Sequence, residues 1–158
     1  MNVGFISTRL AGTDGVSLET AKMADVLRRH GHHIFYCAGE LDGDVPGLLA
    51  PELHFKDPVA QALGKRAFGV SQPDPHLRAD IAARARQLQQ PLRRFLAQYA
   101  IEYVIIQNAL AIPMQLPLAQ ALADVLQETQ VPALAHNHDL YWERERFRHS
   151  QIEEFLEA

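Results

Sequence analysis

The segment Gly12-Thr13-Asp14-Gly15 is a candidate site for an anion. Glycine lets a phosphate approach the backbone closely, and the N–H groups at the start of a following helix would point at it. The motif is weak, because it matches neither the G-x-G-x-x-G dinucleotide fingerprint nor the Lys-Ser/Thr ending of a P-loop. Gly12, Asp14 and Gly15 are therefore candidate ligand-binding residues, but no sequence motif identifies the ligand.

His136, His138 and Asp139 form a second candidate site. Residues two apart on an extended chain face the same way, and imidazole with carboxylate suits several transition metals, as in a metal hydrolase. The other histidines show no spacing that would complete such a site, so we expect no metal. We favour a polar site, in which a neutral imidazole forms a hydrogen bond with a ligand hydroxyl. For His138, a purely structural role at the end of a strand is an open alternative.

Short apolar runs alternate with longer segments of helical period, which is typical of successive βα units. We expect an α/β, Rossmann-like fold, with helices flanking an open parallel sheet in the order 3-2-1-4-5. The expected strands are residues 3–7, 33–37, 53–55, 103–106 and 131–135. Helices should begin near residues 16, 77 and 114, and a last one should lie in the charged segment that opens at residue 141. Pro91 should kink the second helix or begin another, and residues 39–75 should be the least ordered part.

The carboxyl ends of the strands should position the candidate residues. In an open parallel sheet, ligands bind outside these ends, near the point where the strand order reverses. Asn108 follows the fourth expected strand and His136 follows the fifth. We therefore expect the His136 ring to point into a cleft that it shares with Gly15 and Asn108.

Composition limits the class of protein. The chain has 158 residues, of which 47% are hydrophobic, a size and content suited to one domain with a single core. A net charge of −4 without a basic stripe argues against nucleic acid as a partner. Cys37 lies in an apolar run and is expected to be a small buried hydrophobe. With no cationic leader and no apolar run of about 18 residues, we expect a cytoplasmic protein without a transmembrane segment.

The order of residues through the first helix resembles the "GGV…La..L…GH" opening of family 4 glycosyltransferases of GT-B architecture. The residues that carry this resemblance are Asp14, Gly15, Val16, Ala24, Leu27, Gly31 and His32. His136-Asn137 similarly resembles the end of a comparable strand in the acceptor-side domain of those enzymes. Together these motifs span essentially the whole chain.

The resemblance implies two Rossmann-like domains that face a cleft, of which residues 1–158 would be the N-terminal, acceptor-side one. The C-terminal nucleotide-sugar domain would be absent, so the chain alone should be inactive. The complete enzyme would be a retaining glycosyltransferase that moves a hexose from a nucleotide sugar, such as a UDP- or GDP-hexose, to a hydroxyl acceptor without a cofactor. Its partners would be the small-molecule sugar donor and acceptor.

Individual residues can be matched to the family's motifs. Gly15 matches the glycine that approaches the donor's diphosphate, and His136 matches the catalytic histidine beside the transferred sugar. Asn108 falls where some members have a polar residue. Asp14 departs from the family pattern, because it replaces the first glycine of the pair. By position, His138 and Asp139 would also contact the substrates.

Two further expectations concern the whole chain. A different class of function, a stand-alone Rossmann-like module that binds a nucleotide or phosphate without catalysis, is the alternative to the transferase. A homodimer through the final helix is also expected, because truncation would leave an apolar face open there. The residues of that face are Trp142, Phe147, Phe155 and Leu156.

Overall fold

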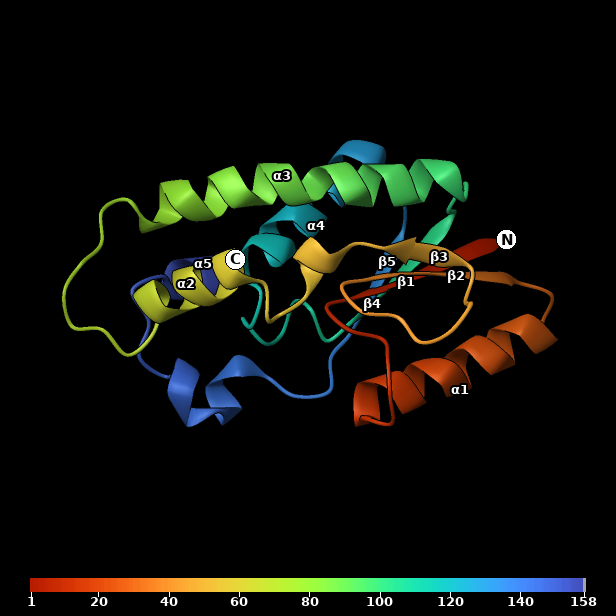
Figure 1. The fold of residues 1–158 in the computed structure, drawn as a ribbon, viewed down its shortest axis with the longest axis horizontal. Helices are drawn as coiled ribbons and strands as arrows, with labels where there is room; N and C mark the ends of the chain where they lie inside the picture. The colour runs from red at the N-terminus through yellow and green to blue at the C-terminus, as the bar shows by residue number, and fades with distance from the viewer. Residues whose placement is uncertain (158) are drawn as a thin grey trace.

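The structure is a computed structural model that describes residues 1–157, and its centre is a five-stranded sheet (Figure 1). The strands are β1 (Asn2–Ser7), β2 (His33–Ala38), β3 (Gly47–Leu49), β4 (Tyr103–Gln107) and β5 (Ala133–His136). Every pair is parallel, and the order is β3-β2-β1-β4-β5. The predicted α/β class and strand order 3-2-1-4-5 are confirmed.

Helices cover both faces of this sheet. They are α1 (Gly15–Arg29), α3 (Leu77–Gln98) and α4 (Leu116–Thr129). Two further helices, α2 (Pro58–Ala67) and the short α5 (Glu153–Leu156), pack beside α3 and α4, beyond the end of the sheet. Because side chains alternate between the faces of a strand, Phe5 packs toward Ala24 of α1 while Ile6 packs into the cluster formed with α3 and α4. Figure 1 shows α1 on one side of the sheet and α3 with α4 on the other.

The third strand lies earlier than the sequence predicts. Residues 53–55 are not a strand; a 3₁₀ helix (Pro51–Leu53) occupies the start of that region. The strand is instead β3, whose Gly47 lies so close to β2 that an added Cβ would be 2.0 Å from the Tyr36 carbonyl oxygen. Leu53 is fully buried in the core. The apolar pattern at 53–55 therefore reflects a buried turn.

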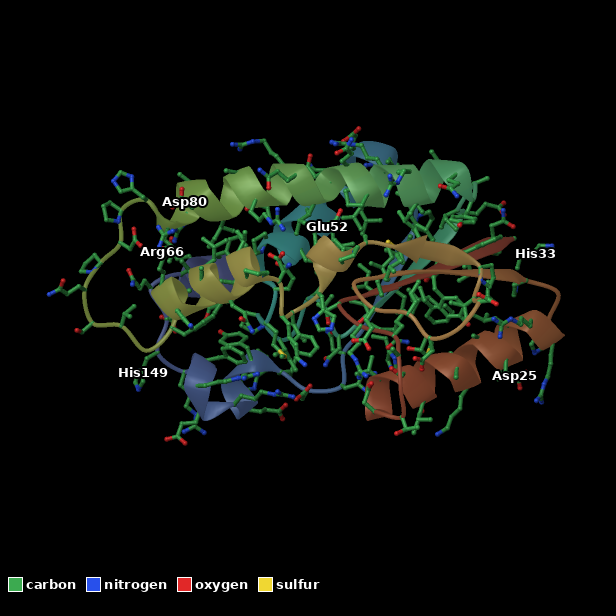
Figure 2. The ribbon with its side chains drawn as sticks, in the orientation of Figure 1. Asp25, His33, Glu52, Arg66, Asp80 and His149 are labelled. Carbon is green, nitrogen blue, oxygen red and sulfur yellow. The ribbon has the colours of Figure 1, made fainter. Side chains whose placement is uncertain are left out.

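Residues 39–75 contain more regular structure than we predicted. The helix α2 begins directly after Asp57, whose carboxylate accepts a hydrogen bond from the Ala60 N–H at 3.0 Å. Pro58 takes the first position of α2, where proline is tolerated. Arg66 also joins α2 to α3 through an ion pair with Asp80 at 2.7 Å (Figure 2). The sequence did not predict α2, because capping, ion pairing and buried apolar side chains outweigh the Gly and Pro content there.

The helix α3 passes through Pro91 without a break. Pro91 therefore does not begin a second helix. The fully buried Leu88, Leu92 and Phe95 lie on both sides of it. Their burial outweighs the cost of about 3 kcal/mol for a proline inside a helix.

The segment after residue 140 is not the single helix that we predicted. It forms two 3₁₀ helices, Tyr141–Glu143 and Glu145–Phe147, and then α5. Phe147 is buried, and Phe155 and Leu156 pack against the cluster of α2 and α3 residues. Trp142 alone of the four predicted residues is largely exposed, so there is no open apolar face for the expected dimer. No helix within residues 1–157 is long and apolar enough to cross a membrane.

Candidate functional site at the carboxyl ends of the strands

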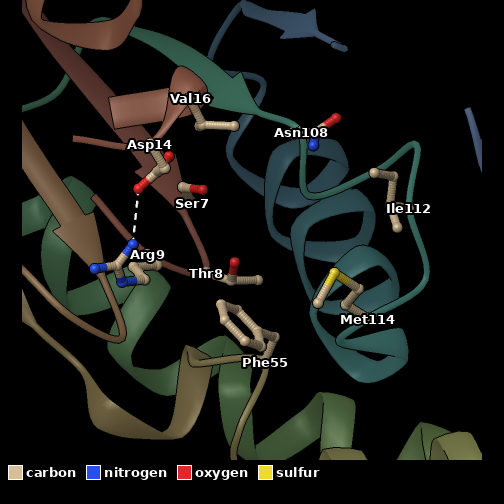
Figure 3. Close-up of a pocket in the computed structure, with 9 residues that line it drawn as sticks. All are labelled: Ser7, Thr8, Arg9, Asp14, Val16, Phe55, Asn108, Ile112 and Met114. Atoms are coloured by element: carbon tan, nitrogen blue, oxygen red, sulfur yellow. Dashed lines mark hydrogen bonds and ion pairs between the residues drawn. The ribbon is translucent and has the colours of Figure 1, made fainter. Parts of the chain in front are cut away.

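A pocket of about 220 Å³ lies where β1 and β4 end (Figure 3). Ser7, Thr8 and Asn108 line it at the strand ends, and Asp14 and Val16 line it from the start of α1. Its remaining wall consists of Arg9, Phe55, Ile112 and Met114. The topology thus brings Asp14 of the glycine-containing segment and Asn108 to one pocket, as expected for the carboxyl edge of a parallel sheet, whereas Gly12 lines a separate pocket beside α1.

Asp14 caps the N-terminus of α1. Its carboxylate accepts hydrogen bonds from the Ser17 N–H at 3.0 Å and from the Ser17 hydroxyl at 2.9 Å, and it pairs with Arg9 at 2.7 Å. Partial burial raises the pKa of this carboxyl, but the Ser17 hydrogen bonds and the Arg9 charge together hold it below its ordinary value. A carboxylate therefore occupies the helix end that a phosphate was expected to approach.

Arg9 is shared between two carboxylates. Its Nε donates to Glu40 Oε2 at 2.9 Å, in addition to the pair with Asp14, and His54 Nε2 lies 3.1 Å from the same Glu40 oxygen. The hydrogen bond from Arg9 lowers the pKa of the Glu40 carboxyl. This network, Arg9 with Asp14, Glu40 and His54, ties the loop after β1 to α1 and to the end of β2.

The two glycines of the segment differ in their surroundings. The Gly12 N–H donates to the Asp42 carboxylate, and Gly12 has a φ of +77°, which favours glycine. At Gly15, an added Cβ would meet nothing within 4 Å. Packing therefore does not require glycine at position 15, and its open backbone leaves room for a ligand. Ligand binding by Gly12, Asp14 and Gly15 stays a prediction.

Replacing Asp14 by alanine should lower the free energy of unfolding by about 1 kcal/mol, the usual cost of losing an N-cap. Asp14→Asn should cost much less, because asparagine caps helices equally well. Since the pKa of Asp14 is held below its ordinary value, the charged carboxylate stabilises the fold fully at neutral pH. That contribution should be lost as the pH falls through the lower folded value. Urea denaturation of both variants at several pH values checks this. An Asp14→Ala variant with the same free energy of unfolding as the unaltered chain would contradict it.

Gln107 orients both histidines at the end of β5. Its side chain is fully buried, and its Oε1 lies 2.9 Å from His136 Nδ1 and 3.2 Å from His138 Nε2. A carbonyl oxygen only accepts hydrogen bonds, so both of these ring nitrogens carry a hydrogen. In neutral His136 the Nε2 atom then keeps its lone pair, and it can accept a hydrogen bond or a proton from a ligand hydroxyl.

Asn108 connects the ends of β4 and β5. Its N–H donates to the His136 carbonyl at 2.9 Å, and its Oδ1 accepts from the His138 N–H at 3.1 Å. Its Nδ2 lies 3.3 Å from Asp139 Oδ1. The φ of Asn108 is +57°, a left-handed conformation that asparagine tolerates well. Asn108 therefore lines the pocket and also positions the segment 136–139.

Asp139 faces a cation and an amide. Arg144 Nε donates to its Oδ2 at 2.8 Å, opposite the contact with Asn108. Within residues 1–157, no group of three His, Cys, Asp or Glu side chains is arranged to hold a metal ion. The metal-hydrolase alternative therefore lacks its ligand set in this part of the chain.

Burial raises the pKa of the Cys37 thiol to about 12, which agrees with its expected role as a small buried hydrophobe.

The predicted residues form two connected groups. Asp14 and Asn108 line the pocket, whereas His136, His138 and Asp139 do not line it and instead contact Gln107 and Asn108. Of the three residues predicted to share a cleft, Asn108 lines this pocket, and His136 and Gly15 do not. The catalytic role of His136 stays a prediction.

Several residues of the site were not predicted from the sequence. They are Arg9, Phe55 and Met114. Gln107, the polar end of an otherwise apolar strand, was expected at this edge together with Asn108, but its contacts with the two histidines were not predicted. The roles of Arg9 and Phe55 depend on loop conformations that no periodic pattern encodes.

Comparison with known proteins gives one informative similarity. The chain is 24% identical over 162 residues to mannosylglucosylglycerate synthase of Petrotoga mobilis, a glycosyltransferase. The match covers 99% of this chain but 37% of that protein. The chain therefore spans well under half the length of this relative. No family model and no solved structure matches.

Proposed function

We propose that this chain is the acceptor-side, Rossmann-like domain of a retaining family 4 glycosyltransferase of GT-B architecture. The enzyme would move a hexose from a nucleotide sugar, such as a UDP- or GDP-hexose, to a hydroxyl of a small acceptor. The observation that carries this proposal is the similarity of almost the entire chain to a glycosyltransferase of greater length. The confirmed strand order and the polar groups at the strand ends support it.

The relative's name points to a class of acceptor. A mannosylglucosylglycerate contains two sugars and a glycerate, so its acid group belongs to the acceptor side of the product. We propose that the acceptor here is likewise a small glycoside that carries a carboxylate. The transferred hexose would come from a donor held mainly by the second domain.

The chain's own residues would act by positioning and by electrostatic stabilisation. His136, fixed by Gln107, would present Nε2 to a hydroxyl of the transferred sugar. Asn108 would hold the segment 136–139 against β4. Gly15 would leave space for the donor's diphosphate to approach the backbone. No metal is needed in this mechanism, because N–H groups and basic side chains can hold a diphosphate.

A stand-alone phosphate-binding module receives less support from the site. Asp14 places a carboxylate at the N-terminus of α1, and Asp42 accepts the Gly12 N–H. Both carboxylates would oppose a phosphate that had no second domain to hold it.

We expect the isolated 158-residue chain to show negligible sugar transfer, because the donor would bind mainly to another domain. A longer protein with a second α/β domain after this one should turn over a nucleotide hexose. The measurement is the rate of nucleotide release by each of the two proteins in separate assays, at equal protein concentrations and with the same acceptor. Steady turnover by the isolated chain, or none by the longer protein with any nucleotide hexose, would contradict the proposal.

A further inference from the structure

A second, larger cavity adjoins the pocket at the strand ends. Its volume is about 560 Å³, and it shares Phe55 and Met114 with the first pocket. The cavity lies between α2 and the 3₁₀ helix Glu145–Phe147. A ligand of two or three small units could therefore extend from one space into the other.

The charged side chains that line this cavity are all cations. They are Lys56, Lys65 and Arg146, and no aspartate or glutamate joins them in the wall. Within the described residues, none of the three forms an ion pair. Their near neighbours behave differently, since Arg66 pairs with Asp74 and Asp80. In a chain of net charge −4, three unpaired cations around one cavity are a local positive site.

Aromatic rings support two of these cations. The Arg146 guanidinium lies 4.5 Å from the centre of the buried Phe147 ring, which packs edge-on against Phe68 with centroids 4.9 Å apart. The Lys56 ammonium lies 6.0 Å from the centre of the Phe55 ring. Such contacts favour cations over the ring faces. The wall thus combines apolar surface with positive groups, as in many sites for small polar ligands.

We propose that this cavity binds the acid group of the acceptor, with Lys65 and Arg146 as the main contacts to its carboxylate. This inference rests on the proposed transferase function and adds the residues that select the acceptor. With the carboxylate in the second cavity, the rest of the acceptor extends past Phe55 and Met114 toward Asn108. The cavity therefore distinguishes an acidic glycoside from a neutral one of nearly equal size.

The test compares two probes that differ at the acid group, a glucoside of glycerate and the same glucoside of glycerol. Binding to the 158-residue chain is measured by titration calorimetry without any donor. The unaltered chain should bind the glycerate compound about tenfold more tightly, the size expected for one charged hydrogen bond. Added salt should reduce this preference, because it screens exposed charges.

The double variant Lys65→Gln/Arg146→Gln should lose the preference for the acid. Both side chains are exposed, so the fold should be unaffected, and circular dichroism checks this. Arg148→Gln is the matched control, since Arg148 is an exposed cation nearby that does not line the cavity. Equal affinity for the two probes, no binding of the glycerate probe, or a preference that survives the double variant would overturn the inference. Because no donor is present, these outcomes are independent of whether the longer protein transfers a sugar.

Discussion

Replacing His136 by alanine in the longer enzyme should lower turnover by a factor of about 100 to 1,000, the usual cost of removing one positioned polar group from a transition state. The stability of this domain should change little. His136 is only partly buried, and the buried Gln107 oxygen would still accept a hydrogen bond from His138. The measurements are kcat/KM with saturating acceptor and urea denaturation of the same variant.

His138→Ala is the matched control for this prediction. His138 contacts the same Gln107 oxygen and is also a histidine, but it follows the end of β5 and is more exposed. We expect its loss to reduce turnover much less. The assignment of His136 fails if both variants reduce turnover equally, or if the effect of His136→Ala follows a matching loss of stability.

Phe95→Ala should destabilise the domain by about 3–5 kcal/mol, the range for truncating a large aromatic side chain in a core. Phe95 is completely buried in α3, and its ring fills the space beside Gly4 of β1, where an added Cβ would lie 2.7 Å from it. The Tyr99 ring is also near, with centroids 5.6 Å apart. Alanine would leave a cavity between the helix layer and the central strand.

The neighbouring residue provides the control. Arg94 is exposed and forms no ion pair within residues 1–157, so Arg94→Ala should change stability by no more than about 0.5 kcal/mol. Guanidinium denaturation of both variants at pH 7 gives the comparison. A loss below about 1 kcal/mol for Phe95→Ala would show that the core between α3 and the sheet collapses around the missing ring.

The sequence was sufficient to predict the central sheet because β1, β2 and β4 are mostly buried and therefore read as apolar runs. It was insufficient for β3, a strand of three residues that is placed by backbone pairing with β2 rather than by an apolar pattern. The helix α2 was missed for a related reason. Its Pro58 and Gly64 resemble loop signals, while its stability comes from the Asp57 cap and from contacts distant in sequence.

For the candidate site, the sequence predicts which residues lie near one another but not how their side chains are oriented. The carboxyl ends of parallel strands must meet at one edge, so the proximity of Asn108 to the segment 136–139 follows from the strand order. The tautomer of His136 follows only from the position of the Gln107 oxygen. In the same way, the ion pair between Arg9 and Asp14 depends on the path of the loop after β1.

The ion pair between Arg9 and Asp14 makes the two adjoining cavities electrically unequal. Of the network of Arg9 with Asp14, Glu40 and His54, only Arg9 and Asp14 line the first pocket, and the charges of this ion pair cancel there. The second cavity carries three unpaired cations. An acidic molecule that diffuses toward this surface is therefore attracted to the second cavity rather than to the first pocket. The resulting field steers the acid group toward the second cavity before any contact forms.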